Sequence, residues 1–577
     1  MTAQQPAPAN PIYRPFSLRL CFFAAVFLCD GASRFRSAGP ASGRLGWLWL
    51  TGTGIADVRR GVWAAVQVLS AHVPPEEVSL IRDTPTGDGH RSGVATAGSR
   101  SPGDPYRALE AAEALRRNGI HAVAVTMVDN SGVARVKAMP VERLAQAAAN
   151  GIGAPPVFDF FGGDDSIAPG GSPVGDLRML PDLAALRSLA AMPGWAWAPA
   201  ERVALDGSSH PGCQRAFAHR QQERAAAAGL ELKMAFETEW VLDAGKDGRL
   251  GPDGVAGEDR LVPVTTGPAY GMGRLVDVAG FSSELLAMLA GSGVEVVQLH
   301  PEYAPSQMEL SVAPKGPVGA SDEVVVVRQT LRAVAARHGW RVSLSPAFEP
   351  EGVGNGAHLH MSLWRGSTNL LAPVMSSATI GIGAASDEAR CRPSGLDPVG
   401  EAWLAGILDA LPALMAVVAP SAASYLRLQP QRWAAPWRCW GRENREAALR
   451  LVAGSAWGGP EGANVELKVV DASANPYLVT GAVLAAGLDG VRRSLTLPQE
   501  VTVDPALLDD DGRKAAGVMR LPRSLGEALD ELDRSEVLRS AMGDQLANAF
   551  SAVRRAELER FAASSDEEIA VGSRWVW

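Results

Sequence analysis

The segment GNGAHLHMS, residues 354–362, contains two histidines and a serine that alternate with apolar residues, a spacing that could place them in one active site. These are His358, His360 and Ser362. Alternate side chains of an extended strand point to the same face, so we expect the three polar groups to share one face. The glycines before them allow the backbone to approach a ligand closely. Taken alone, the motif fits equally well a strand that carries two half-buried histidines.

Glutamates with the same alternation occur on other predicted strands. Glu237 and Glu239 lie on the strand predicted at residues 232–242 and would face the same side. Each acid taken singly is expected on a solvated strand face. Gathered on one sheet face, such acids would repel one another unless cations neutralised them, and carboxylates with one imidazole suit Mg²⁺ or Mn²⁺. The predicted cluster consists of Glu237, Glu239, Glu302, Glu309 and Glu466.

An arginine-rich segment, residues 424–450, supplies the opposite charge through Arg427, Arg445 and Arg450. Arginine binds carboxylate and phosphate through paired hydrogen bonds. Metals combined with arginines indicate phosphoryl transfer from a nucleotide. The chain has no Walker motif and no kinase glycine loop, so neither of those nucleotide sites is expected. The alternative is a set of surface arginines on a helix and a loop.

The elements that would position these groups follow from periodicity, capping residues and turns. Asp104 is a suitable helix N-cap, with Pro105 after it and Gly119 past the helix end. The turn at residues 129–132 separates two strands and predicts a hairpin. We predict helices at residues 104–118, 214–228, 282–292, 322–338, 402–418 and 476–488, with two more between 524 and 561. We predict strands at residues 121–128, 133–138, 232–242, 294–299, 307–312, 340–347 and 465–470.

Composition sets the broad class of the protein. The 577 residues are 47% hydrophobic and 20% charged, which is typical of a soluble protein. A net charge of −9 argues against a nucleic-acid partner bound by bulk electrostatics. The five cysteines are scattered without metal-ligand spacing, which favours a reducing, cytoplasmic location. The apolar run Leu20–Cys29 is too short for a membrane span, which needs about 20 residues, so no membrane partner is expected.

Three regions are expected along the chain. Residues 1–103 are rich in Gly, Ser, Arg and Ala and predict a poorly ordered extension. Residues 104–206 predict a small α+β domain, and residues 207–577 hold the acids, histidines and arginines.

Taken in chain order, these segments resemble the glutamine synthetase family over about residues 105–565. Any one segment is weak, and their order makes the resemblance specific. The matching segments are VDNSG (128–132), GD (175–176), PD (181–182), ETE (237–239), Glu302 with QME (307–309), Gly354 with HLHMS (358–362), SYLR (424–427), NR (444–445) with Arg450, and Glu466 with Asp471 and ANPYL (474–478).

The resemblance implies an α+β fold, with a small β-grasp N-terminal domain (104–206). A larger catalytic domain (207–577) would contain a curved antiparallel sheet and helices. It also implies a homo-oligomeric ring with active sites between neighbouring subunits. The expected substrates are glutamate, ATP and ammonia or an amine, with two or three Mg²⁺ or Mn²⁺ ions per site.

The resemblance also implies a role for each matching residue. Glu239, Glu302 and Glu309 would hold one metal, and Glu237, His358 and Glu466 would hold another between the ATP phosphates. The nucleotide would contact His360, Ser362 and Arg450, the amino acid would contact Gly354 and Arg427, and Arg445 would contact the transferring phosphate. Phosphorylation of the glutamate side chain gives an acyl phosphate that an amine can attack, and the metals and arginines stabilise the developing charge.

The departures from the family pattern fall at the amine end. Ammonia-using members carry a glutamate before an Ala-Pro pair, whereas here Trp433 stands near that place. An indole cannot accept a proton, but it can wall off a pocket or stack on a cation. The family's Asp-Gly-Ser-Ser loop is missing, and Asp159 is the nearest substitute for its aspartate. Lys468 replaces an arginine near the substrate's charge, and Val353 replaces a residue that is often polar.

This pattern resembles members that join glutamate to larger amines, such as γ-glutamylpolyamine or γ-glutamylethanolamide synthetases. Our prediction is a glutamate–amine ligase whose amine is larger than ammonia. Two alternatives stay open: a true glutamine synthetase, and a catalytically inactive ring-forming homologue. The presence of all the metal-ligand positions argues against inactivity, because clustered acids without a metal would only repel one another.

Overall fold

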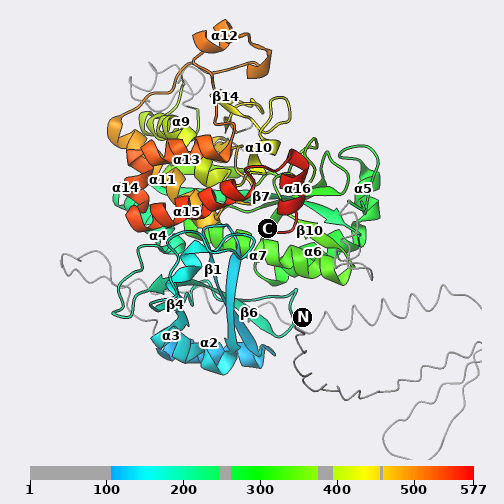
Figure 1. Ribbon diagram of the computed structural model, residues 1–577, viewed down its shortest axis with the longest axis vertical. Coiled ribbons are helices and arrows are strands. Elements are labelled where there is room, and N and C mark those ends of the chain that lie inside the picture. Colours follow the sequence, from blue (N-terminus) through cyan, green and yellow to red (C-terminus); the bar gives the residue numbers. More distant parts are fainter. Residues whose placement is uncertain (1–104, 246–260, 374–393, 455–458) are drawn as a thin grey trace, which may run out of the picture. The chain divides into compact units, whose positions relative to one another are not determined.

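The structure is a computed structural model that describes residues 105–245, 261–373, 394–454 and 459–577 (Figure 1). The predicted N-terminal extension and the predicted helix cap Asp104 therefore lie outside the described residues. Within them the fold is α+β, as predicted, and it is built on two main sheets.

The first main sheet has six strands and lies in the N-terminal region, with β1 between β2 and β6. β2 pairs with β1 antiparallel through the turn at residues 129–132, which confirms the predicted hairpin. The apolar side of β1, including Val123 and Val125, packs with Leu115 and Leu144 from the helices. The elements are α2 (Pro105–Arg117), β1 (Ala122–Val128), β2 (Ala134–Pro140), α3 (Leu144–Asn150), β3 (Ile152–Ala154), β4 (Leu177–Pro181), β5 (Arg187–Ser188) and β6 (Trp195–Val203).

The second main sheet has nine strands and carries the predicted acids and histidines. Its main order is β14-β15-β16-β11-β7-β9-β8, and only the β14–β15 pair in it is parallel. The strands are β7 (Glu231–Asp243), β8 (Val296–Pro301), β9 (Gln307–Val312), β10 (Arg341–Ser343), β11 (Leu359–Arg365), β12 (Thr368–Asn369), β14 (Trp440–Arg442), β15 (Leu449–Val452) and β16 (Asn464–Leu467). A short pair, β13 (Trp437–Arg438) with β17 (Met519–Arg520), lies apart from it.

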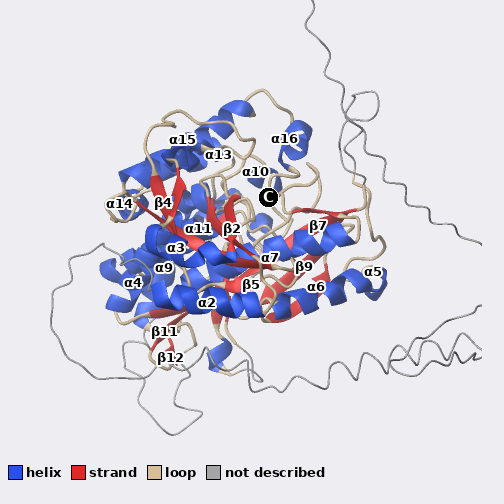
Figure 2. Cartoon of the chain, turned by 90° about the horizontal axis from the view of Figure 1, so that it is seen from below, coloured by secondary structure: helices blue, strands red, loops and turns tan. Residues whose placement is uncertain are grey.

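Helices pack against this sheet through one large apolar core, which joins Phe236 and Leu359 of the strands to Leu331 and Val479 of the helices. Figure 2 shows two of them, α6 and α7, alongside β7 and β9. The helices are α4 (Gln214–Ala227), α5 (Met272–Asp277), α6 (Ala279–Gly291), α7 (Pro317–Arg337), α9 (Pro398–Val418), α10 (Ser424–Arg427), α11 (Pro476–Arg493), α12 (Asp510–Ala515), α13 (Leu525–Arg534), α14 (Glu536–Met542), α15 (Asp544–Arg560) and α16 (Asp566–Ser573).

Helices α9 and α11 cross at a contact that only glycine permits. A Cβ on Gly406 would lie 2.4 Å from the carbonyl oxygen of Ala486, and one on Gly490 would lie 2.2 Å from that of Ala402. Among the described residues, α9 is also the one helix long and apolar enough to cross a membrane. Most of it is buried against other parts of the protein, so it is a core helix of this fold.

Some predicted boundaries were wrong, and each has a local cause. The strand predicted at residues 340–347 is only β10, because Leu344 donates to Trp577 at the chain end instead of extending the ladder. α7 begins at Pro317 rather than at residue 322, since Gly316 and Pro317 form an efficient helix start. The region from 524 to 561 holds three helices rather than two, because Ser535 caps α14 and Gly543 adopts a positive φ.

The predicted hairpin turn also joins the N-terminal region to the larger one. Asn475 donates from Nδ2 to the carbonyls of Val128 and Asp129, and Trp577 donates from Nε1 to that of Ser131. A Cβ on Gly132 would lie 2.3 Å from the carbonyl oxygen of Ser473. The turn is therefore fixed by the larger region as well as by its own strands.

Candidate metal and substrate site

Strand register brings the predicted acids and histidines together on the nine-stranded sheet. Glu239 of β7 pairs with Glu309 of β9, and Glu309 in turn pairs with His300 of β8. On the other side, His360 of β11 pairs with Glu466 of β16. Because antiparallel partners share a face, this register collects acids from strands far apart in the chain.

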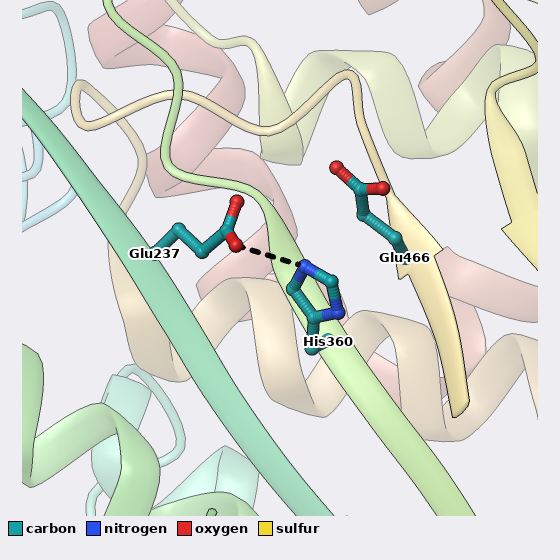
Figure 3. Close-up of side chains that lie close together, drawn as sticks. All are labelled: Glu237, His360 and Glu466. Atoms are coloured by element: carbon teal, nitrogen blue, oxygen red, sulfur yellow. Dashed lines mark ion pairs between the residues drawn. The ribbon is translucent and has the colours of Figure 1, made fainter. Parts of the chain in front are cut away.

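Glu237, His360 and Glu466 form the first possible metal-binding group, with ligand atoms all within 4.8 Å of one another (Figure 3). His360 Nε2 lies 3.3 Å from Glu237 Oε1. His358 joins this group, since its Nδ1 lies 3.1 Å from Glu237 Oε2 and 3.3 Å from Glu466 Oε1. The predicted trio of Glu237, His358 and Glu466 is therefore gathered here, with His360 as an additional close neighbour.

His300, Glu302 and Glu309 form a second group of the same kind. His300 Nε2 lies 3.2 Å from Glu309 Oε1, and its Nδ1 lies 3.5 Å from Glu302 Oε1. We did not predict His300 as a site residue. The available signal was its position two residues before Glu302, the same alternation that singled out Glu237 and Glu239.

Burial raises the pKa of each of these acids, and their neighbours decide whether the net shift is upward or downward. Burial raises the pKa of Glu239 and the pKa of Glu309 to about 7. Burial alone would also raise the pKa of Glu237, but the hydrogen bond with His358 and the nearby imidazole of His360 outweigh it and lower that pKa. The charge on Lys468 likewise overcomes burial and lowers the pKa of Glu466 to about 2.

Basic side chains lie directly against the acids. Lys468 Nζ is 3.0 Å from Glu466 Oε1, and Arg450 Nη1 is 3.0 Å from its Oε2. Arg427 donates from Nη2 to His358 Nε2 at 3.1 Å and is itself buried. Arg427 and Arg450 are therefore part of the cluster, whereas Arg445 is exposed and only lines the cavity that opens over it.

A cavity of about 520 Å³ opens over the acids and the basic residues. Every residue predicted to bind a metal or the amino acid lines it, together with Arg445 and Arg450. The predicted residues in its lining are Glu237, Glu239, Glu302, Glu309, Gly354, His358, Arg427, Trp433, Arg445, Arg450, Glu466 and Lys468. Its lining also includes Tyr270, Tyr303 and His300, which sequence reasoning missed.

A second cavity, of about 450 Å³, contains the other residues predicted to face the nucleotide, His360 and Ser362. It shares Glu237 with the first cavity. Trp364 lies beside Ser362, to whose Oγ it donates at 2.8 Å, and Lys233 Nζ sits 4.0 Å from the centre of one Trp364 ring. The two cavities share the carboxylate of Glu237, and this arrangement suits a nucleotide whose base lies in one cavity and whose phosphates extend toward the acids.

Glycine is required where the loop before β11 passes the site. A Cβ on Gly354 would lie 2.0 Å from the carbonyl oxygen of Pro346 and 2.9 Å from Arg427 Cβ. A Cβ on Gly356 would lie 2.6 Å from His358 Nε2 and 2.7 Å from Glu239 Oε1. The glycines thus permit a close approach, as predicted, but to the protein's own side chains.

The structure does not bring Asp159 into either cavity of its own chain. Its side chain is only 2% exposed, with His210 Nε2 at 2.7 Å from Oδ2 and Arg202 against Oδ1. Burial alone would raise the pKa of Asp159, but the charge on Arg202 overcomes it and the pKa is lowered. A carboxylate held in this way joins parts of the N-terminal region and is not available to a substrate amine.

The donor set fits divalent metal ions. Carboxylates and imidazoles converge from different strands, and burial holds some of the acids at a raised pKa that a cation would reverse. His360 Nε2 is buried and makes no hydrogen bond of acceptable geometry, as expected for an imidazole nitrogen that awaits another partner.

Comparisons with known proteins agree with this geometry. The family pattern described as the glutamine synthetase catalytic domain matches residues 211–570. The chain is 47% identical over 478 residues to the γ-glutamylpolyamine synthetase of Streptomyces coelicolor, covering 82% of this chain and 97% of that protein. It is 30% identical to the glutamate–methylamine ligase of Methyloversatilis universalis, covering 75% of this chain and 92% of that one. A crystal structure described as a novel glutamine synthase homolog superposes with a TM-score of 0.67 at 32% identity, covering 79% of this chain and 99% of that chain.

Proposed function

This chain belongs to the glutamine synthetase family and is an ATP-dependent glutamate–amine ligase, and we propose that its amine is a polyamine rather than ammonia. One observation carries the proposal. Near the place where ammonia-using members carry a glutamate, the chain has Trp433, whose half-exposed indole lines this cavity. The 47% identity to a γ-glutamylpolyamine synthetase supports the same substrate class.

The family depends on ATP and divalent metals, and we propose Mg²⁺ or Mn²⁺ at two or three positions per site. The donors would be the two predicted trios, Glu237, His358 and Glu466 on one side and Glu239, Glu302 and Glu309 on the other, which overlap the two close groups described above. When bound, such ions neutralise phosphate charge and polarise the phosphoryl group. His300 and His360 are close enough to these groups to hold or orient their carboxylates.

The basic residues would serve the anionic substrates. Arg427 and the backbone at Gly354 would hold glutamate, while Arg445 and Arg450 would stabilise charge on the transferring phosphoryl group. Lys468 is buried beside Glu466, so we assign it both to that carboxylate and to the substrate's charge. The nucleotide would extend into the cavity that contains His360 and Ser362.

The reaction then has two steps. An oxygen of the glutamate side chain attacks the γ-phosphorus of ATP, and ADP leaves. The amine nitrogen attacks the acyl carbon of the resulting phosphate, loses a proton and expels inorganic phosphate. Trp433 cannot take that proton, and Asp159 is excluded by its ion pairs. Glu302 lines the cavity beside Tyr303, accepts a hydrogen bond from Tyr270 at Oε2 (2.7 Å), and would be the carboxylate that receives this proton.

We further propose a cytoplasmic homo-oligomeric ring, as in the family that the chain resembles. Size determination in solution tests the ring directly, and a stable monomer with full activity would contradict it.

The test of function is phosphate release from ATP with Mg²⁺ and glutamate, measured against ammonium, ethanolamine, putrescine and spermine, with mass detection of the product. Turnover with putrescine or spermine and little with ammonium is the expected result. Turnover with ammonium alone would identify a glutamine synthetase. Turnover with none of them, in a protein that still assembles, would favour the inactive homologue.

A further inference from the structure

Exposed aromatic rings gather at the mouth of the substrate cavity. The side chains of Tyr303 and Trp433 are 47% and 46% exposed, although large aromatic rings are usually well buried. Their ring centroids are 5.1 Å apart and their planes are inclined by 56°. Tyr303 follows β8, whereas Trp433 belongs to the loop after α10, so the pair bridges opposite sides of the opening.

Trp433 sits on a strained piece of backbone. Gln431, Trp433 and Ala435 have φ angles of +59°, +56° and +52°, in the left-handed region that residues with side chains avoid. Each such residue costs about 1–2 kcal/mol, so three of them in one short loop persist only where the surroundings hold them. The loop is therefore fixed in the position that presents the indole to the cavity.

Glu446 is the group that holds this loop. Its Oε1 accepts the backbone N–H of Trp433 at 2.9 Å, and its side chain lies in the protein interior with Oε2 unpartnered. Arg432 donates from Nη1 to the carbonyl oxygen of Gly352 at 3.3 Å, which ties the loop to the opposite wall. Glu446 does not line the cavity itself, so it acts through Trp433.

We propose that Tyr303 and Trp433 bind the distal ammonium of an α,ω-diamine or polyamine, with Glu446 as the positioning residue that sets the indole. The proposal rests on the proposed function and specifies how the amine is selected. The reactive nitrogen would enter toward Glu302, next to Tyr303 in the chain, and the carbon chain would extend outward along the exposed faces of the two rings, which contact each other. There the second cation would meet ring faces, which attract ammonium groups electrostatically.

Ring faces suit this position better than a carboxylate would. Arg432 and Arg445 line the same cavity, and Arg445 is assigned above to the transferring phosphoryl group, so an acid at the rim would pair with these arginines. An aromatic face attracts a cation without neutralising those arginines. It also contacts the methylene groups of the amine, so one pair of side chains selects for both the charge and the length of the amine.

The experiment compares 1,4-diaminobutane with butylamine, which has the same length but no distal cation. For the wild type, kcat/KM is expected to be about two- to fivefold higher for the diamine, as one solvent-exposed cation–π site provides. Trp433→Leu and Tyr303→Leu keep apolar bulk but remove a ring, and each is expected to reduce that preference, mainly through KM for the diamine. Trp433→Phe retains a ring face and is expected to retain most of the preference.

Glu446 is tested by two substitutions. Glu446→Gln keeps an oxygen that can accept the Trp433 N–H and is expected to retain the diamine preference, whereas Glu446→Ala loses it. Leu507→Ala changes an exposed apolar residue outside both cavities and serves as the matched control. Circular dichroism of each variant identifies any that fail to fold, and diamine quenching of tryptophan fluorescence, compared between wild type and Trp433→Phe, reports binding without turnover.

Failure of this inference is distinguishable from failure of the proposed function. Hydroxylamine traps an acyl phosphate as a hydroxamate without needing the aromatic pair to read a second charge. Hydroxamate formation together with equal use of butylamine and diamine would overturn the aromatic selection and leave the ligase chemistry in place. Unchanged preference in both leucine variants would overturn it as well. Absence of hydroxamate in the wild type would overturn both.

Discussion

The two sides of the cavity are built in different ways. The acidic side consists of β7, β8, β9, β11 and β16, where register fixes each side chain against a neighbour. The opposite side comes from the segment between α10 and β15, where non-glycine residues adopt left-handed backbone and arginines reach inward. The strand side carries the residues that match the motifs of the family, and the loop side carries the predicted departures from them.

This difference separates the parts of the site that perform phosphoryl transfer from those that select the amine. Strands hold charges that would repel one another at fixed spacing, which suits groups that must always meet the same cations. A loop can change a side chain without disturbing a ladder, so substrate selection can vary there at small cost.

The largest expected effect is on the strand side. Glu239→Gln removes a proposed metal ligand and is expected to lower turnover on the order of a thousandfold, because several kcal/mol of charge stabilisation are lost. The same change removes a buried charge, so the metal-free protein should become more stable above neutral pH. Turnover and thermal unfolding measure the two effects.

Glu231→Gln is the control for that substitution, since Glu231 begins the same strand but is exposed and outside both cavities. Equal activity of Glu239→Gln and the wild type would remove the functional distinction between the two sides of the cavity.

The second, intermediate effect is on metal affinity, which is expected to depend on pH. The pKa of Glu239 and that of Glu309 are raised to about 7, so a metal ion must displace protons below that pH. Affinity for Mn²⁺ is expected to rise about tenfold for each carboxylate between about pH 6 and about pH 8. Calorimetry in buffers of different ionisation enthalpy would detect the released protons, and a pH-independent affinity would contradict the prediction.

The sign for stability follows from the same shifts. Native Glu239 and Glu309 bind protons more tightly than in the unfolded chain, where the value is 4.5. Their contribution to the stability of the metal-free protein is therefore lost as pH rises from 4.5 to about 7. Added metal should raise the melting temperature more at the higher pH.

The smallest expected effect is the difference in stability between a glycine substitution on the loop side of the cavity and one on the strand side. Gln431→Gly relieves a left-handed residue on the exposed loop and is expected to stabilise the protein by roughly 1 kcal/mol. Glu231→Gly, in the strand, is expected to cost about 0.5–1 kcal/mol. Thermal unfolding at equal protein concentration compares them, and equal destabilisation by both would mean that the loop is not strained.

The sequence predicted the strand side of the cavity much more fully than the loop side. The alternation of Glu237 with Glu239 and of His358 with His360 predicted a shared face, and the order of motifs identified the family. Neither could reveal that Glu309 pairs with His300, because register between distant strands is a tertiary property. The left-handed backbone at Trp433 had no signal, since it occurs without glycine or asparagine.

Asp159 shows the same limit of sequence reasoning, here for a residue that was predicted to lie in the site. Its position near a missing family loop predicted a role with the amine, but Arg202 and His210, more distant in the chain, hold its carboxylate instead. The residue roles in the site stay predictions, to be tested by the substitutions above.

Helix α9 bears on how this protein is made. Ribosomes release the chain from its N-terminus, and α9 is finished before its main partners, α11 and α13, have been synthesised. Until then, an apolar stretch long enough to resemble a membrane signal lacks its main packing partners. Chains truncated between Val418 and Pro476 are therefore expected to aggregate or recruit chaperones, and chains that extend past Arg534 are expected to escape this fate.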